Sequence, residues 1–338
     1  NVDMGKYKAE TLQQYYDTHG IPLRARLIAS FSQLSSLGSL VPGLYNFVSS
    51  NKLTATVIRK MAGFSTKRSL PALHTTTLRK WADKNLGGLN AKTTTGKKVV
   101  LFCDEFTNYN DTSTGINAIL LLNRLGYWVD LPPHVQSGRA ALSKGMLKKA
   151  KEYARENVKV FAPRVSPQTP LVGIEPSAIL TFRDEYPALL EGEQKLAALS
   201  LAENVMTIEE FICQQHDEGR LDTRIFTAEK KTVHYHGHCH QKALSSIDYG
   251  LRMMSLAPNK SICPISCGCC GMAGAFGFEK EHYELSMQIG ELQLFPAIRQ
   301  ADPQDLIAAS GTSCRHQILD GTGRKAWHPV DILHSFLE

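Results

Sequence analysis

The chain has 338 residues, of which 43% are hydrophobic and 21% charged. This composition is typical of a folded globular protein; it excludes a disordered chain, and no stretch is apolar enough for a membrane span. The net charge is +6, yet residues 1–100 carry 15 Lys and Arg against 4 Asp and Glu, a local net charge of +11. Because these basic residues are scattered and no nucleic-acid motif accompanies them, docking on another protein module is favoured over a solvated face or a nucleic-acid site.

The first 95 residues are predicted to form an all-helical N-terminal segment. A first helix is expected over residues 8–16, ended by Gly20 and Pro22, and apolar residues then recur at helical spacing. Residues 85–98, rich in Gly, Thr and Lys, are predicted to be a linker. The chain does not begin with methionine, so we expect this segment to continue a longer polypeptide.

From residue 98 onward, short apolar runs alternate with longer amphipathic stretches. The predicted strands are residues 99–103, 127–131, 171–174, 232–236 and 306–310. The predicted helices are residues 114–125, 144–157, 208–216, 241–254, 279–299 and 314–319. Strands that alternate with helices indicate parallel sheets, so the predicted fold class is α/β.

Two stretches of this α/β region look like copies of one another. With residues 99–103 laid on 232–236, three motif points match in order: Phe106 with Cys239, Gln136-Ser137 with Cys269-Cys270, and Ala178 with Cys314. We therefore expect two tandem pseudo-symmetric repeats with parallel sheets, each about 130 residues long. The first, residues 96–228, has no cysteine at the motif points, whereas the second, residues 229–338, has one at every point.

The cysteines are clustered rather than spread along the chain. Six of the eight lie between Cys239 and Cys314. Disulfide scaffolds are short and secreted, so this long chain with local clustering points to a reducing compartment and to metal ligation by thiolates. Loops that follow parallel strands gather at one crevice. Four thiols are expected to meet there, enough for an iron–sulfur cluster or a tetrathiolate zinc site: Cys239, Cys269, Cys270 and Cys314.

Three motifs in the second repeat carry a family resemblance. They are His236-Gly-His-Cys-His240, the run Cys-Cys-Gly-Met-Ala-Gly over residues 269–274, and Gly311-Thr-Ser-Cys-Arg-His-Gln317. Together they resemble the cysteine-rich Cys-Cys-Gly domain of heterodisulfide reductase B subunits and of glycolate and lactate oxidase iron–sulfur subunits. The segments 102–109 and 173–186 look like the C-terminal part of fused proteins that also hold an FAD-linked oxidase domain and a ferredoxin module.

The resemblance implies an electron-transfer module of a flavin-linked D-2-hydroxy-acid dehydrogenase, of the lactate, glycolate or 2-hydroxyglutarate type. The four motif cysteines would then hold a 4Fe-4S cluster, or zinc or no metal after preparation in air. FAD would lie only in the upstream domain, and this fragment alone would not turn over a substrate. The partners implied are the upstream FAD and ferredoxin domains and a downstream, quinone-linked acceptor. The implied location is the cytoplasm, with peripheral association at the inner membrane face.

Other residues are secondary candidates at the same centre. A nearby thiol could be a further ligand, alternating histidines could ligate the metal or hydrogen-bond to the cluster, and one arginine could offset its negative charge. These residues are Cys267, His236, His238, His240 and Arg315. Gln317 stands where the heterodisulfide reductase form ends its Cys-x-x-Cys motif, which argues against the double cluster of that enzyme. Cys103 and Cys213 are expected to be buried small hydrophobes.

Two other functions remain open at this point. The same four thiolates could hold a structural zinc ion in a docking module, with electrons bypassing the centre. Alternatively, Cys269 and Cys270 could act as a dithiol on disulfides, although adjacent cysteines form a disulfide only with strain.

Overall fold

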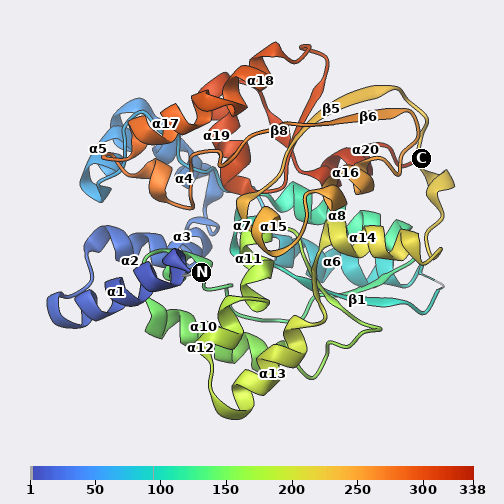
Figure 1. Cartoon of the computed structure of the whole chain (residues 1–338), viewed down its shortest axis with the longest axis horizontal. Helices are drawn as coiled ribbons and strands as arrows, with labels where there is room; N and C mark the ends of the chain where they lie inside the picture. Colours follow the sequence, from blue (N-terminus) through green and yellow to red (C-terminus); the bar gives the residue numbers. More distant parts are fainter. Residues whose placement is uncertain (1–2, 94) are drawn as a thin grey trace.

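Two four-stranded parallel sheets organise the chain, one in each predicted repeat (Figure 1). The computed structural model describes residues 3–93 and 95–338. The first sheet has the order β2-β1-β3-β4: β1 (Lys98–Phe102), β2 (Trp128–Asp130), β3 (Leu171–Gly173) and β4 (Val205–Thr207). The second has the order β6-β5-β7-β8: β5 (Lys231–His236), β6 (Lys260–Pro264), β7 (Leu306–Ala309) and β8 (Ala326–Trp327). Equal strand order and parallel pairing confirm the α/β fold with two sheets and agree with the predicted duplication.

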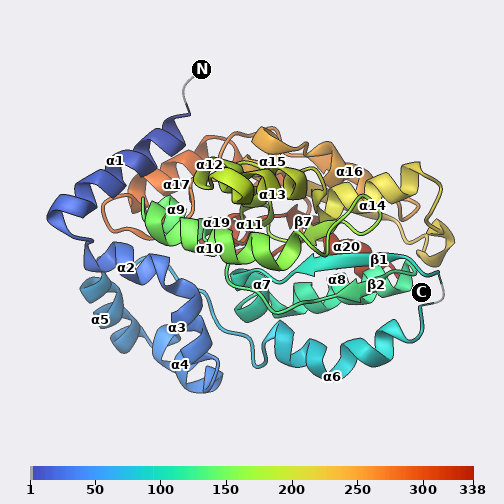
Figure 2. The same cartoon turned by 90° about the horizontal axis from the view of Figure 1, so that it is seen from below.

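Helices connect the strands on both faces of each sheet (Figures 1 and 2). The first half contains α7 (Glu105–Tyr109), α8 (Thr112–Arg124), α9 (Arg139–Ser143), α10 (Leu147–Phe161), α11 (Pro176–Ile179), α12 (Glu185–Leu189), α13 (Gly192–Ala202) and α14 (Ile208–Asp217). The second contains α15 (Cys239–Leu244), α16 (Asp248–Met254), α17 (Tyr283–Leu292), α18 (Leu294–Gln300), α19 (Thr312–Thr322) and α20 (Pro329–Ser335). Short 3-10 turns are η1 (Leu180–Phe182), η2 (Thr223–Ile225) and η3 (Phe276–Phe278).

The two halves share one hydrophobic core between their sheets. Val99 and Leu101 of β1 enter this core, as do Val233 and Tyr235 of β5. Alternate residues of a strand point to opposite faces, so the other face of each sheet builds a separate core under its own helices. The halves therefore meet through helices that share this core, α8 against α20 and α14 against α16.

The N-terminal segment is helical, as predicted, and consists of α1 (Met4–His19), α2 (Leu23–Ala29), α3 (Phe31–Gly38), α4 (Pro42–Ser50), α5 (Lys52–Ala62) and α6 (Leu78–Asn90). Asp3 caps α1 by accepting from two backbone N–H groups of its first turn, and Gly20 ends it with φ of 80°. In Figure 2, α2 to α5 form a lobe at one end of the molecule, whereas α6 lies along the first half. Leu78 and Ala82 of α6 belong to the core between the sheets.

Several predicted boundaries are wrong. The linker expected over residues 85–98 is helical to Asn90, because the apolar face of α6 packs on the first half. The helix expected over residues 279–299 is broken into α17 and α18, since the ring of Pro296 would clash with the carbonyl of Leu292 in a continuous helix.

The helix expected over residues 241–254 is likewise two helices, α15 and α16, with a break in which Ser246 accepts from the backbone N–H of Asp248. Three short strands, β4, β6 and β8, were not predicted. None of the helices in residues 3–93 and 95–338 is long and apolar enough to cross a membrane.

Candidate metal centre

Three loops of the second half meet beyond the carboxyl ends of its strands. Cys239 is the first residue of α15, which follows β5 after two residues. The loop after β6 carries Cys269 and Cys270, and Cys314 lies in the first turn of α19, which follows β7. Because β5 is paired with both β6 and β7, these three loops are neighbours at one edge of the sheet.

The four predicted thiols form a continuous chain of contacts. The thiol of Cys269 contacts those of Cys239 and Cys270, and Cys270 also contacts Cys314. Cys270 and Cys314 are buried, whereas Cys239 and Cys269 are half-buried at the outer side. The structure therefore brings together all four residues that the sequence singled out, with a closed inner end and a more open outer end.

The loop after the double cysteine has an unusual backbone. Gly271, Ala273 and Gly274 all have positive φ, of 98°, 41° and 67°. This conformation directs the N–H groups of Gly271 and Ala273 at the Sγ of Cys269, with a Gly271 N to Sγ distance of 3.3 Å. Ala273 is strained there, at a cost of about 1 kcal/mol, as is typical of residues held for function. Successive N–H groups of this kind form an anion-binding nest, which suits a thiolate or a metal–sulfur cluster.

The thiol contacts favour charge on particular sulfurs. Hydrogen bonds from Cys239 and Cys270, together with the backbone N–H groups of Gly271 and Ala273, hold the pKa of Cys269 well below its ordinary value. A hydrogen bond from Cys270 and the nearby His236 also lower the pKa of Cys314, although burial opposes this. The surroundings therefore favour negative charge at Cys269 and Cys314, the two ends of the Cys269–Cys270–Cys314 run.

His236 lies beneath the thiols and is completely buried. Its Nδ1 is 3.0 Å from the Sγ of Cys267, and its Nε2 has no hydrogen-bond partner among residues 3–93 and 95–338. One imidazole nitrogen of His236 and the sulfurs of Cys270 and Cys314 all lie within 4.8 Å of one another. Burial lowers the pKa of His236, but contacts with Cys267 and Cys314 raise it overall, to about 9. The structure therefore brings Cys267 and His236 to the centre.

The other two histidines have structural contacts. His238 caps α15, with its Nδ1 accepting from the backbone N–H of His240 at 3.2 Å. A Cβ at Gly311 would come within 2.3 Å of the His238 ring, so this glycine allows the ring to lie beside Cys314. His240 stacks on His238, and burial lowers its pKa to about 3. His238 thus borders the thiols, whereas the charge of Arg139 in the first half contributes to the lowered pKa of His240.

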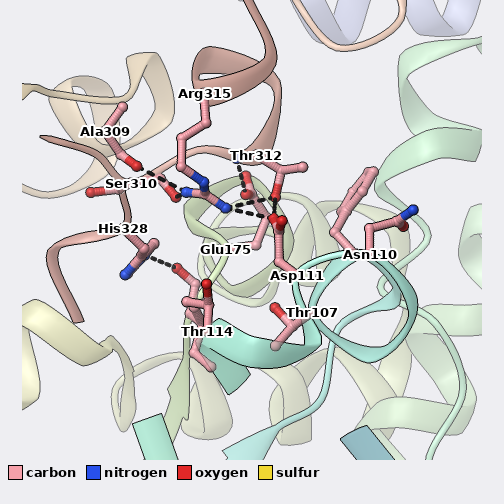
Figure 3. A network of polar contacts seen from close by, with 12 residues as sticks. Thr107, Asn110, Asp111, Thr114, Glu175, Ala309, Ser310, Thr312, Arg315 and His328 are labelled. Carbon is pink, nitrogen blue, oxygen red and sulfur yellow. Dashed lines mark hydrogen bonds and ion pairs between the residues drawn. The ribbon is translucent and has the colours of Figure 1, made fainter. Parts of the chain in front are cut away.

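Arg315 does not serve as the counter-charge that the sequence suggested. Its guanidinium donates to the carbonyls of Ala309 and Ser310 and forms an ion pair with Asp111 at 2.5 Å (Figure 3). Beside it, the backbone N–H of Thr312 donates to the carboxylate of Glu175 at 2.8 Å. Arg315 sits next to a ligand candidate in sequence, but its charge serves to join the two halves.

The equivalent point of the first half has polar groups in place of thiols. Gly138 (φ 78°) matches Gly271, so Gln136 and Ser137 stand where Cys269 and Cys270 stand. The backbone N–H and the hydroxyl of Ser137 both donate to Glu105, at 3.0 and 2.7 Å. Glu105, not Phe106, is the first residue of α7, and the ring of Phe106 instead stacks on Phe31 of α3. The predicted match of Phe106 with Cys239 is therefore wrong by one residue.

The remaining cysteines lie outside this centre. Cys103 and Cys213 are buried in the core between the sheets, and burial raises the pKa of each to about 12, as expected of small hydrophobic residues. Cys263 lies in β6.

Residues far away in the sequence also reach the thiol loop. Lys242 donates to the carbonyls of Cys267 and Gly268, and Gln317 donates to the carbonyl of Cys270 at 2.9 Å. Arg68 of the N-terminal segment donates to Gly277, at the end of the same loop. No spacing signal in the sequence connects Arg68 with a loop some two hundred residues further on, and only a buried contact reveals it.

Comparison with known proteins places this chain among relatives of dehydrogenases. No family model matches the chain. It is 27% identical to the D-2-hydroxyglutarate dehydrogenase of Escherichia coli K12 over 344 residues, which cover 98% of this chain and 32% of that protein. It is 26% identical to one of the subunits of the anaerobic glycerol-3-phosphate dehydrogenase of the same organism, covering 94% of this chain and 78% of that protein.

A D-2-hydroxyglutarate dehydrogenase of Haemophilus influenzae is 24% identical over 356 residues. The chain thus spans about a third of the length of the D-2-hydroxyglutarate dehydrogenases, with 33% of the last one covered. The chain is related to oxidoreductases, in agreement with the prediction from its sequence.

Proposed function

We propose that the chain is an iron–sulfur electron-transfer module of a flavin-linked D-2-hydroxy-acid dehydrogenase, with a Cys-Cys-Gly domain as its second repeat. The observation that carries this proposal is the meeting of Cys239, Cys269, Cys270 and Cys314 at one sheet edge, in the second half alone. The similarity to D-2-hydroxyglutarate dehydrogenases across nearly the whole chain supports the substrate class.

The residues of the centre fit a 4Fe-4S cluster. Four thiols in contact supply the sulfur ligands that such a cluster needs, and the N–H groups of Gly271 and Ala273 can hydrogen-bond its sulfurs. The buried Nε2 of His236, which has no hydrogen-bond partner in the described part of the chain, adds a further polar group beside the sulfurs of Cys270 and Cys314. When bound, a cluster here would accept and release single electrons.

The chain's own residues prepare this centre in three ways. The nest over residues 271–273 stabilises negative charge at Cys269 without reorganisation when the metal binds. Met272 and Ile318, both buried, exclude water from the inner side. Lys242 fixes the outer loop through the carbonyls of Cys267 and Gly268, and this leaves the half-buried Cys239 and Cys269 as the side from which a redox partner can approach.

The partner in this proposal is a flavin-bearing protein part, and its docking surface is the lobe α2 to α5. Half of the twenty exposed large apolar side chains of the described residues lie between Leu34 and Met61. Residues 18–82 contain nine Lys and Arg and not one Asp or Glu. An apolar face with a cationic rim is complementary to an acidic protein surface with an apolar centre. The D-2-hydroxyglutarate dehydrogenase relatives are about three times as long as this chain, so they contain room for such a part.

Electrons would then pass from the flavin through the cluster to a downstream, quinone-linked acceptor. We place the module in the cytoplasm, where thiols stay reduced, and at the inner membrane face when it meets that acceptor. The chain by itself is expected to oxidise no 2-hydroxy acid, because the proposal assigns substrate binding and FAD to another part.

Anaerobic reconstitution of the chain with iron and sulfide tests the proposal. About four iron and four sulfide per chain are expected, with a broad visible absorption that dithionite bleaches. Stoichiometric zinc with no cluster assembly would overturn the electron-transfer role and favour the zinc-stabilised docking module. Turnover of a dithiol–disulfide pair through Cys269 and Cys270 without metal would favour a thiol catalyst instead.

A further inference from the structure

One buried cation of the N-terminal segment reaches the loop that carries the double cysteine. Arg68 lies between α5 and α6, in a part of the chain that shares no sequence motif with the centre. Its side chain is completely buried, which is rare for an arginine and requires that its donors be paired. The groups that pair with it therefore indicate what this side chain holds in place.

The guanidinium of Arg68 makes contacts in three directions. Its Nε donates to the carbonyl of Gly277 at 3.1 Å, and one terminal nitrogen donates to the hydroxyl of Ser286 at 3.2 Å. The other terminal nitrogen pairs with Asp320 of α19 at 3.1 Å. The group also lies over the ring of Tyr283, 5.0 Å from its centre. Its planar fork therefore ties the loop after the cysteines, α17 and α19 to one point.

Ser286 connects this point to the cysteines. Its carbonyl accepts from the side chain of Gln317 at 3.0 Å, and the same Gln317 nitrogen donates to the carbonyl of Cys270 at 2.9 Å. Ser286 also packs against Gly271, the residue after Cys270. A Cβ on Gly271 would lie only 2.2 Å from the Ser286 carbonyl oxygen. Ser286 and Gln317 are both completely buried, so no exposed side chain intervenes.

The loop from Cys270 to Gly277 is thus held at both ends through Ser286. Gln317 holds the cysteine end and Arg68 holds the far end. Between them lie Gly271 and Ala273, whose N–H groups are directed at Cys269. A loop with three residues of positive φ keeps this shape only if its surroundings over-determine it.

From these contacts we infer that Arg68 is a positioning residue of the metal centre, acting through Ser286 and Gly277 on the N–H groups that face Cys269. The N-terminal helical segment is then part of the centre rather than only a docking surface. The inference rests on the proposed function in that both place a metal at the thiols, but it is independent of whether that metal is a cluster or a single ion.

The Arg68→Lys variant distinguishes a role of Arg68 in positioning the metal centre from a contribution to the stability of the fold alone. Arg68→Lys keeps the charge, but a lysine presents one nitrogen and cannot serve Gly277, Ser286 and Asp320 together. The first control, Asp320→Asn, removes the ion pair and leaves the contacts of Arg68 with Gly277 and Ser286 in place. The second control, Lys67→Gln, changes the neighbouring residue, an exposed lysine that pairs with Glu284.

The affinity of the full chain for cobalt(II) is the measurement, by titration under argon against a chelator of known affinity. Arg68→Lys is expected to weaken cobalt binding by about 10–100-fold, as loss of groups that orient metal ligands generally does. Asp320→Asn and Lys67→Gln are expected to stay within about threefold of the wild type, even where urea shows Asp320→Asn to be less stable. Wild-type affinity in Arg68→Lys, or equal losses in Arg68→Lys and Asp320→Asn, would overturn the inference.

A second variant covers the case in which Arg68→Lys does not fold. Ser286→Ala removes the hydroxyl that accepts from Arg68, and it is expected to weaken cobalt binding in the same direction; wild-type affinity in this variant would overturn the inference. The proposed function fails separately, because a wild-type chain that binds cobalt but assembles no iron–sulfur cluster would contradict electron transfer and leave the role of Arg68 intact.

Discussion

Glu105 occupies in the first half the position that Cys239 occupies in the second. Each is the first residue of the helix that follows the first strand of its half, and two residues separate that strand from the helix. The preceding residues, Asp104 and His238, both cap that helix through a side-chain acceptor. The duplicated scaffold thus carries a carboxylate at the position where the metal centre has a thiol.

The first half is expected to remain free of a cluster even with its thiols restored. The variant carries cysteines at Glu105, Gln136, Ser137 and Ala178, and we expect iron per chain to stay at the wild-type value after reconstitution. Four thiols are not sufficient, because a metal site also needs surrounding groups that orient its ligands. In the first half the surrounding groups serve other contacts, since Ser137 donates to Glu105 and Tyr186 donates to the carbonyl of Ser137 at 2.9 Å.

The reverse substitution is the matched control for that experiment. Cys239→Glu brings the first-half carboxylate into the second half and should abolish the cluster there. A doubling of iron in the four-cysteine variant would show that the scaffold alone builds the centre.

Replacement of Cys270 by serine is expected to remove the cluster, whereas Cys103→Ser should retain it. Serine is a poor ligand for iron in such clusters, and Cys270 is the thiol that joins Cys269 to Cys314. Cys103 lies in the core between the sheets, whereas Cys270 and Cys314 belong to a separate core. Iron and sulfide analysis with visible absorption checks this, and equal cluster content in the two variants would contradict the ligand assignment.

The sequence predicted which thiols meet better than it predicted the residues around them. Cys239 and Cys314 were identifiable because each follows a predicted strand, and parallel strands bring such loops together whatever the details of packing. The strand before Cys269 and Cys270, β6, was not predicted, and these two residues were identified from their adjacency in the sequence.

The match of Phe106 with Cys239 failed because the two first strands were aligned without regard to which of their residues face the core. In the structure, Val99 and Leu101 of β1 enter the shared core, as Val233 and Tyr235 of β5 do. Aligning Val99 with Val233 moves the match by one residue, so that Glu105 rather than Phe106 corresponds to Cys239.

Contacts across the halves were beyond prediction for a different reason. Arg315 was a candidate for offsetting the charge of the metal centre because it follows Cys314 in the sequence. Its position on α19 instead directs the side chain to Asp111. Arg68 and Ser286 are joined by tertiary packing between segments with no shared periodicity. Such contacts depend on the relative placement of helices, which local patterns do not encode.

His134 should make the stability of the chain sensitive to acid. It stands where the second half has Cys267, its ring stacks on Phe102, and its Nε2 accepts from the backbone N–H of Cys103 at 3.1 Å. Burial, with a smaller effect of Arg79, lowers the pKa of His134 to about 3. Because the unfolded state takes up this proton near pH 6.5, stability is complete above that pH and falls as the pH drops toward 3, by at most about 1.4 kcal/mol per pH unit.

Urea unfolding at several pH values between 7 and 4.5 measures this effect. His134→Gln removes the titrating group, so it should be less stable than the wild type at pH 7 but lose less stability on acidification. His19→Gln, at the exposed end of α1, is the control and should follow the wild-type pH dependence. An unchanged pH dependence in His134→Gln would show that His134 does not contribute to it.

Alanine at Gly271 is expected to destroy the centre, whereas alanine at Gly268 of the same loop should be tolerated. Gly271 has φ of 98°, and an added Cβ would lie 2.2 Å from the carbonyl oxygen of Ser286, a backbone atom held by Gln317. Neither the strained dihedral nor the clash can be relieved by a side-chain rotation, so Gly271→Ala should lower the unfolding free energy by about 2 kcal/mol or more. Gly268 is exposed, and its Cβ would meet no atom within 4 Å, so Gly268→Ala should change stability by less than about 0.5 kcal/mol.

Urea unfolding of the metal-free chains measures both changes in unfolding free energy. Iron content after reconstitution should be lost only in Gly271→Ala, because that substitution displaces the N–H groups that face Cys269. Full iron content in Gly271→Ala would mean that the positive-φ loop is not needed to hold the metal.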